Sequence, residues 1–194
     1  PNMQDSLRYT LTVNAPESKD NDFTWKDFQL RNNSELVAIF GNFVNRTLVL
    51  THKYYDGIVP NQVDEKSEYY GILKEVYKYP ESISKSLDNF KFRESVNTLI
   101  DLARLGNKFL ADTEPWKLIK IADQKRKVEE IMFISIQICG MLAILSEPFV
   151  PFASEKLKSI LNLRGKKWTE LNISSNIIDS NKLINKPELI FRKI

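Results

Sequence analysis

The chain has 194 residues, of which 42% are hydrophobic and 27% charged, as in ordinary globular proteins, and its formal net charge is +3. One histidine (His52) and one cysteine (Cys139) exclude an internal disulfide and any metal cluster beyond carboxylates, and a lone cysteine favours the cytoplasm. No apolar run approaches the length of a membrane span, no signal peptide is found, and phosphate-loop, nucleophile-elbow and HExxH motifs are absent. We therefore expect no membrane segment and no catalytic, cofactor or metal site in this chain.

The first elements in chain order are a short helix and a long one. Residues 5–14 form the short helix, and a polar linker follows. Thr24 is a good N-cap because Asp27 lies three residues later. Apolar residues then recur at helical spacing without a proline as far as Tyr55, which predicts one helix of about 30 residues, or about 45 Å. An Asp-Gly pair ends it.

The rest of the chain repeats the helical pattern. Thr113 and Pro115 mark the start of a short helix, with Thr113 as its cap and Pro115 in its first turn. The whole pattern is that of an all-α antiparallel helix bundle with a short irregular or extended C-terminal tail. The other predicted helices are 65–79 (which stops at Pro80), 81–88, 90–112, 124–146 and 154–163.

The stretch GNFVNRTLVL, residues 41–50, places two polar side chains on one helix face. Asn42 and Arg46 are four residues apart at the border of the apolar stripe. An amide offers a donor and an acceptor and a guanidinium offers five donors, so together they form a hydrogen-bonding pair at the edge of a groove. The alternative is a solvated flank, or a pair that holds a neighbouring helix. Taken alone, these residues favour that structural interpretation.

The stretch EPWKLIK, residues 114–120, raises the same question for an aromatic ring. Trp116 lies in the first turn of a helix, and Lys117 and Lys120 follow. An aromatic plate beside cations is how single-stranded bases are held, and stacking contributes roughly 1–3 kcal/mol per base. The alternative is a buried ring beside a solvated charged face. We expect Trp116 to be substantially exposed and to line one groove with Asn42 and Arg46.

Four other residues are interpreted as structural. We expect Trp25 to pack against the long helix and Trp168 to pack the tail. His52 is interpreted as an ordinary surface histidine. Cys139 lies on an apolar face and is interpreted as inert packing.

Three runs of sequence together resemble the C-terminal half of methionyl-tRNA synthetases. The resemblance covers about residues 5–163, and the final KPELIFRKI resembles the return segment of that family. Its specific features are N-x-x-x-R on a long helix, a following D-G, a helix containing GNK, P-W, and then a segment of the type P-F-x-P-F. The runs are LVAIFGNFVNRTLVLTHKYYDGIVP (36–60), KFRESVNTLIDLARLGNKFLADTEPWKLIK (91–120) and EPFVPFASEKLKSILNL (147–163).

The resemblance implies an anticodon-binding bundle of the class I synthetase type. In that family the Asn and Arg of the N-x-x-x-R motif contact the first anticodon base, a cytosine, and the Trp after Pro stacks on the splayed anticodon. The implied partner is the anticodon loop of methionine tRNA, with the triplet CAU. The implied RNA-binding residues are Asn42, Arg46, Pro115, Trp116, Lys117 and Lys120.

The catalytic half of the family, with its HIGH-like and KMSKS-like motifs, has no counterpart in this sequence. The resemblance therefore implies that 1–23 ends the segment linking the catalytic core, that 24–163 is the anticodon-binding domain and that 164–194 packs back on it. ATP and zinc are expected in the missing half, whose catalytic domain is the second implied partner, and this chain alone should be inactive. The alternatives are the anticodon domain of a leucine, isoleucine or valine synthetase, and a helical interaction module that does not bind RNA.

Overall fold

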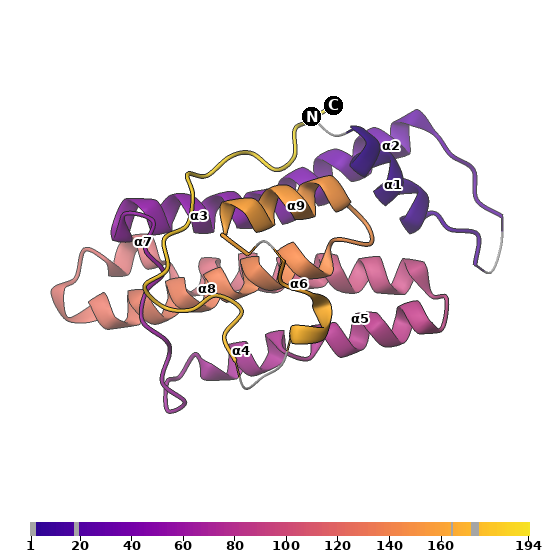
Figure 1. Cartoon of the computed structure of the whole chain (residues 1–194). Helices are drawn as coiled ribbons and strands as arrows, with labels where there is room; N and C mark the ends of the chain where they lie inside the picture. Colours follow the sequence, from indigo (N-terminus) through magenta and orange to yellow (C-terminus); the bar gives the residue numbers. More distant parts are fainter. Residues whose placement is uncertain (1–2, 18–19, 164, 172–174) are drawn as a thin grey trace.

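Helices form the regular structure of the chain in a computed structural model that describes residues 3–17, 20–163, 165–171 and 175–194 (Figure 1). In these ranges the one β-bridge joins Ile58 to Leu183. The predicted all-α bundle is confirmed. Its elements are α1 (Met3–Val13), α2 (Trp25–Arg31), the π-helix η1 (Asn32–Gly41), α3 (Asn42–Tyr55), α4 (Tyr70–Val76), α5 (Tyr79–Asp88), α6 (Phe92–Thr113), α7 (Pro115–Leu118), the 3-10 turn η2 (Ala122–Gln124), α8 (Lys125–Leu145), α9 (Pro151–Ile160) and the 3-10 turn η3 (Trp168–Glu170).

The long helix is continuous, because α2, η1 and α3 follow one another without a break. The Thr24 side chain accepts a hydrogen bond from the Asp27 backbone N–H at 3.1 Å, so the predicted cap is confirmed. Its far end is closed by Asp56 and Gly57, both at positive φ (52° and 80°). The sequence did not indicate the π-helical winding of its middle third, which ends one residue before Asn42.

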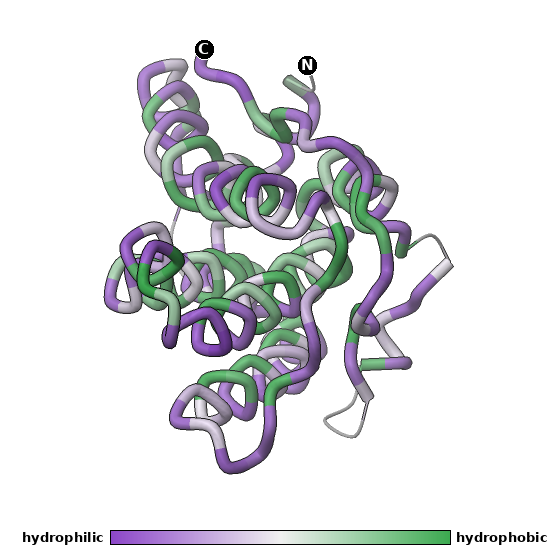
Figure 2. The backbone as a smooth tube through the Cα atoms, turned by 90° about the vertical axis from the view of Figure 1, so that its left-hand side faces the viewer, coloured by the Kyte–Doolittle hydropathy of each residue, from purple (hydrophilic) through white to green (hydrophobic). Residues whose placement is uncertain are grey.

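Helix α8 is the centre of the bundle. It packs against α3, α4, α6, α7 and α9, and every residue from Ile131 to Leu145 is buried. Helix α6 runs antiparallel to both α5 and α8, whereas α3 and α6, which are separated in sequence by α4 and α5, run in the same direction (Figure 1). Viewed end-on in Figure 2, the peripheral helices alternate between hydrophilic and hydrophobic colours along each turn, as amphipathic helices do.

One premise of the sequence analysis is wrong for this central helix. The range Ala122–Leu145 contains an 18-residue window with a mean hydropathy of 1.9, which is long and apolar enough for a membrane span. Within the bundle, however, 89% of that window is buried. Apolar residues on every side of a helix also mark the core of a protein, and here the neighbouring helices cover them.

Three predicted boundaries also need correction. The helix predicted over 65–79 is shorter, since α4 begins at Tyr70, and Pro80 lies in the first turn of α5 instead of ending a helix. Proline is favoured there because first-turn N–H groups have no partner within the helix. Thr113 does not cap α7: its hydroxyl donates to the Phe109 carbonyl, and Glu114 occupies the cap position.

The residues interpreted as structural have mixed outcomes. Trp25 was interpreted wrongly, because it is 73% exposed and contacts Phe23 and Phe28 edge-on. Trp25 is the first residue of α2 and lies outside the core, beside exposed Phe23 and buried Phe28. Trp168 is half-buried against the core. Burial raises the pKa of Cys139 to about 12, in line with inert packing. His52 is half-buried and its Nε2 lies 3.0 Å from the Asn185 carbonyl oxygen.

The C-terminal tail crosses the bundle beside α8 (Figure 1). Buried Gln137 accepts hydrogen bonds from the backbone N–H groups of Ile177 (2.9 Å) and Ile178 (3.1 Å) and donates to the Ile178 carbonyl (2.8 Å). Gly140 allows the close approach, because a Cβ there would lie 2.7 Å from the Ile177 side chain. The C-terminal tail therefore covers this side of the bundle.

Candidate nucleic-acid interface

The candidate interface lies where α3 and α6 touch. A Cβ on Gly106 would lie 2.5 Å from the Phe43 ring, so only glycine lets the two helices come this close. Because α3 and α6 run in the same direction, residues that follow Phe43 lie beside residues that follow Gly106. The glycine in LGNK therefore sets the position of the next side chain, Asn107.

Asn107 joins the two helices through its amide. Its Nδ2 donates to the carbonyl oxygens of Ile39 (2.9 Å) and Ala103 (3.0 Å). Its Oδ1 accepts a hydrogen bond from Asn42 Nδ2 at 3.2 Å. Ile39 belongs to the last turn of the π-helix, so Asn107 binds the backbone where the winding changes to α.

A depression of about 430 Å³ opens beside this contact. Exposed Asn42 and half-buried Arg46 line it from the long helix, and Arg104, Asn107 and Lys108 line it from α6. The predicted Asn–Arg pair thus shares one surface. Asn42 also contacts a neighbouring helix, as the structural interpretation required, but it does so while remaining exposed.

Arg46 connects this depression to Trp116. Its guanidinium carbon lies 4.8 Å from the centre of the Trp116 ring, in a cation–π contact. The expectation of a substantially exposed ring is wrong, because Trp116 is half-buried and packs against the core. Trp116 also does not line the depression itself. Its ring lies beside the depression, with Arg46 between the two.

A sharp turn between α6 and α7 positions Trp116. Glu114 adopts a left-handed conformation (φ 43°) immediately before Pro115, where this conformation is unusual for a residue with a side chain. Pro115 is buried and fixes the start of α7. Lys117 and Lys120 are both exposed, and the Lys117 ammonium pairs with the Glu114 carboxylate at 2.8 Å.

Positive charge dominates the depression. Arg46, Arg104 and Lys108 bring three cations to its lining, and Arg104 is paired with Asp101 at 2.7 Å. Among the described residues, Arg46 and Lys108 have no ion-pair partner. Sequence reasoning missed Arg104, Asn107 and Lys108 as lining residues. A glycine inside a long helix was the available signal, since such a residue usually has a packing reason.

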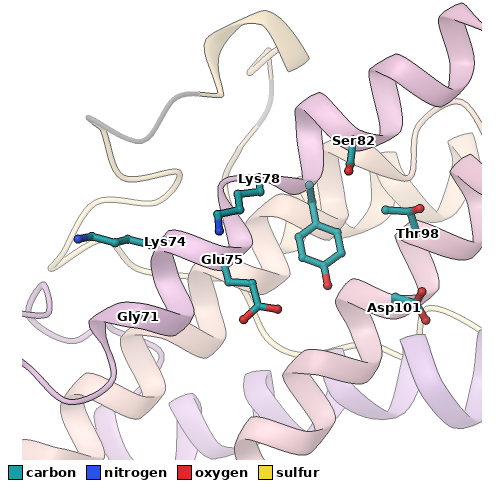
Figure 3. Close-up of a pocket in the computed structure, with 8 residues that line it drawn as sticks. Gly71, Lys74, Glu75, Lys78, Ser82, Thr98 and Asp101 are labelled. Carbon is teal, nitrogen blue, oxygen red and sulfur yellow. The ribbon is translucent and has the colours of Figure 1, made fainter.

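A larger depression of about 620 Å³ lies between α4, α5 and α6 (Figure 3). It is lined by two lysines, Lys74 and Lys78, and by two carboxylates, Glu75 and Asp101. These formal charges cancel, so this depression lacks the excess of cations that nucleic acid binding needs. In the described part of the chain, no group of three or more His, Cys, Asp or Glu side chains could hold a metal ion.

Comparison with known proteins bears on this interface directly. A family model described as the anticodon binding domain of methionyl tRNA ligase matches residues 59–194, more than half of the chain. The chain belongs to this family. A second model, for class I (M) tRNA synthetases, matches residues 2–48. The two matches leave residues 49–58 between them, at the end of the long helix, and together they cover Asn42 and Arg46 as well as the whole of α6.

Individual relatives agree with this family assignment. The chain is 54% identical to a methionine–tRNA ligase of Phocaeicola vulgatus over 195 residues, covering all of this chain and 28% of that protein. It is 52% identical to one of Christiangramia forsetii over 205 residues, covering 29% of that protein. The chain therefore spans less than a third of these relatives. The matches do not favour a leucine, isoleucine or valine enzyme, or an interaction module outside the synthetases.

Solved structures of this family share the fold. The apo form of Mycobacterium tuberculosis methionyl-tRNA synthetase superposes with a TM-score of 0.89 at 19% identity, covering 98% of this chain and 39% of that one. The same enzyme in complex with methionyl-adenylate gives a TM-score of 0.87. At this identity the likeness concerns the arrangement of the helices alone.

Proposed function

We propose that this chain is the anticodon-binding part of a methionine–tRNA ligase and that it reads the CAU anticodon of methionine tRNA. The observation that carries the proposal is the juxtaposition of Asn42, Arg46 and Trp116. The first two share one cationic depression, and the guanidinium of Arg46 covers the Trp116 ring. Cations, hydrogen-bonding groups and an aromatic plate are the three features that hold a splayed base.

Each residue has a separate task in this proposal. Asn42 and Arg46 bind the Watson–Crick edge of cytosine at the first anticodon position, because that edge carries one amine donor and two acceptors. Trp116 stacks on an anticodon base, and Pro115 holds it in place from a buried position. Lys117 and Lys120 attract the phosphates of the loop, since both side chains are exposed.

Binding requires a rearrangement of Arg46. In the free chain its guanidinium covers one face of Trp116. Such a contact contributes about 0.5–1 kcal/mol at exposed sites and about 2 kcal/mol when desolvated, and both side chains are half-buried here. Stacking of a base contributes about 1–3 kcal/mol, and together with the hydrogen bonds from Arg46 to the base it offsets the loss of the cation–π contact. We propose that Arg46 moves from the ring to the base when RNA binds.

The other steps of the reaction are assigned outside this chain. In the intact enzyme, the catalytic domain would attach methionine to its tRNA using ATP, and zinc would be bound there. We place the boundaries of the anticodon-binding domain at 24 and 163, with 1–23 leading from the catalytic core and 164–194 packing back. We place the enzyme in the cytoplasm. This chain alone is then expected to give no methionine-dependent exchange between pyrophosphate and ATP.

Fluorescence binding to anticodon stem-loops tests the proposal. Loops with the triplets CAU and UAU differ at the first anticodon base only, and base contacts of this kind discriminate by about 1–3 kcal/mol. The chain should therefore bind the CAU loop about 5- to 150-fold more tightly. Equal binding of both loops would contradict base reading, and absence of binding to either would contradict an RNA-binding role.

Two substitutions separate the tasks of the site residues. Trp116→Ala should weaken binding of both loops alike, because stacking tolerates every base. Arg46→Ala should reduce the preference for CAU over UAU, because it removes donors that match the acceptors of cytosine. If Arg46→Ala weakens both loops equally, Arg46 contacts phosphate or serves the structure.

A further inference from the structure

The orientation of the Asn42 amide is fixed by Asn107. The Asn107 side chain faces two backbone carbonyl oxygens on one side, those of Ile39 and Ala103, at 2.9 and 3.0 Å. Carbonyl oxygens only accept hydrogen bonds, so the NH₂ end of Asn107 has to face them. Its oxygen then has to face Asn42. An amide flipped the other way would set three oxygens against one another.

The orientation of the Asn107 amide in turn fixes the orientation of the Asn42 amide. An oxygen of Asn107 opposite Asn42 requires a donor, so Asn42 presents its NH₂ group there, at 3.2 Å. The oxygen of the Asn42 amide is then the atom left to face solvent, and Asn42 is exposed at the edge of the depression. Within the part of the chain that the structure describes, that oxygen has no hydrogen-bond partner.

We propose that Asn107 is a positioning residue that turns the oxygen of Asn42 outward and thereby selects a base with an exocyclic amine. An outward oxygen accepts a hydrogen bond from the amine of cytosine. At the same position uracil carries an oxygen, which would leave two acceptors facing each other. The inference rests on the proposed function and adds to it the residue that decides which end of Asn42 meets the base.

Two features of the structure make this orientation rigid. Gly106 brings α6 against Phe43, so Asn107 is held at a constant distance from the long helix. The π-helix ends at Gly41, directly before Asn42, and the Ile39 carbonyl at that junction is one of the two groups that Asn107 binds. The residue that orients the amide therefore also stabilises the local change in winding.

Two substitutions of Asn107 separate the positioning role from a structural one. Asn107→Ser retains a hydroxyl that can donate to the Ala103 carbonyl four residues earlier. Thr113 and Ser135 make the same kind of bond in this chain, each to the carbonyl four residues before it. The side chain of the Asn107→Ser variant is too short to reach Asn42. Asn107→Asp keeps an acceptor for the Asn42 NH₂ group but loses the two bonds donated to carbonyls, so it weakens the helix contact more.

The experiment measures binding of both variants and of the unmodified chain to the CAU and UAU stem-loops, with thermal unfolding of each. We expect Asn107→Ser to lower the ratio of the two affinities about tenfold. We expect Asn107→Asp to keep the ratio within about threefold of the unmodified chain, although it unfolds at a lower temperature. The variant with the smaller loss of stability thus has the larger loss of selectivity.

The outcomes distinguish this inference from the proposed function. If the unmodified chain prefers CAU and Asn107→Ser keeps that preference, or if Asn107→Asp loses it as fully as Asn107→Ser, Asn107 does not position Asn42. If the unmodified chain binds both loops equally, the base reading itself is wrong and this inference with it. A double variant, Asn42→Ala with Asn107→Ser, should show the same ratio as Asn42→Ala alone.

Discussion

A side-chain amide close to a glycine joins two segments at two places in this chain. Gln137 on α8 binds the tail near Gly140, and Asn107 on α6 binds the long helix beside Gly106. In both places a Cβ on the glycine would lie under 3 Å from a neighbouring side chain. The packing device is therefore the same in the two regions.

The two regions differ in whether the hydrogen-bond network of the amide stays in the core or reaches the surface. Gln137 is buried, and its three hydrogen bonds all join it to the backbone of Ile177 and Ile178. The oxygen of Asn107 accepts a hydrogen bond from Asn42, which is exposed beside the cation of Arg46. The first network ends within the core and stabilises the fold. The second ends at the surface, where a ligand can complete it.

The largest expected effect comes from breaking the closed network. Gln137→Leu leaves three buried backbone groups without partners, at about 1–3 kcal/mol each, and should lower the free energy of unfolding by about 3–5 kcal/mol. Urea unfolding measures the loss. Gln29→Leu is the matched control, since exposed Gln29 also binds the tail, at the Ile194 carbonyl, and its loss should cost under about 1 kcal/mol. In neither variant should the ratio of CAU to UAU affinity change.

The next effect comes from the glycine beside the hydrogen-bond network that reaches the surface. Gly106→Ala should destabilise the chain by about 1–3 kcal/mol, because its Cβ would overlap the Phe43 ring and separate α3 from α6. Gly71→Ala in α4 is the control: nothing lies within 4 Å, so better helix propensity should stabilise by about 0.5–1 kcal/mol. Opposite signs in thermal unfolding support close packing at Gly106. Two stabilising changes would contradict it.

A smaller effect belongs to the exposed lysines. Lys120→Ala should weaken binding to the CAU and UAU loops equally and flatten the slope of log affinity against log salt by about 0.7, as for one phosphate contact on a single strand. Lys26→Ala is the control, because Lys26 is exposed on α2 at the far end of the long helix. A change in base preference in Lys120→Ala would mean that Lys120 touches a base.

No reaction at all is expected at Cys139. Burial raises the pKa of its thiol from 9.0 to about 12, so at neutral pH almost no thiolate forms and reagents have no access. Labelling by a maleimide, followed by mass spectrometry, should detect modification only after urea unfolds the chain. Rapid labelling of the native chain would show that the core around α8 opens to solvent, and would contradict the burial of Cys139.

The fold was largely predictable from apolar periodicity and caps. Thr24 and the long apolar stripe located the long helix, and the near-continuous apolar face of 124–146 located α8. Pro80 was misplaced because proline both ends and begins helices, and the sequence around it fits either. Trp25 was misplaced because an aromatic side chain near a helix start carries no periodic signal of its own.

Of the residues that line the depression, only two on the long helix were predicted from the sequence. The spacing of Asn42 and Arg46 put them on one face, but periodicity does not state which polar residue of another helix lies opposite. Asn107 sits within the wide apolar face of α6, where a polar residue reads as an interruption. The contact between Arg46 and Trp116 depends on the left-handed turn at Glu114, which precedes a proline and which no local sequence rule predicts.

One measurement tests the central claim most directly. The claim is that the surface around Asn42 binds the anticodon and that the region around Gln137 does not. Nuclear magnetic resonance of the chain with a CAU stem-loop follows three tryptophan indole signals and the side-chain amides of Asn42 and Gln137 in one experiment. We predict that the signals of Trp116 and Asn42 shift strongly with CAU and less with UAU, whereas exposed Trp25, half-buried Trp168 and buried Gln137 stay in place. Unchanged Trp116 and Asn42 signals in the presence of bound RNA, or shifts centred on Trp25 or Trp168, would contradict the account.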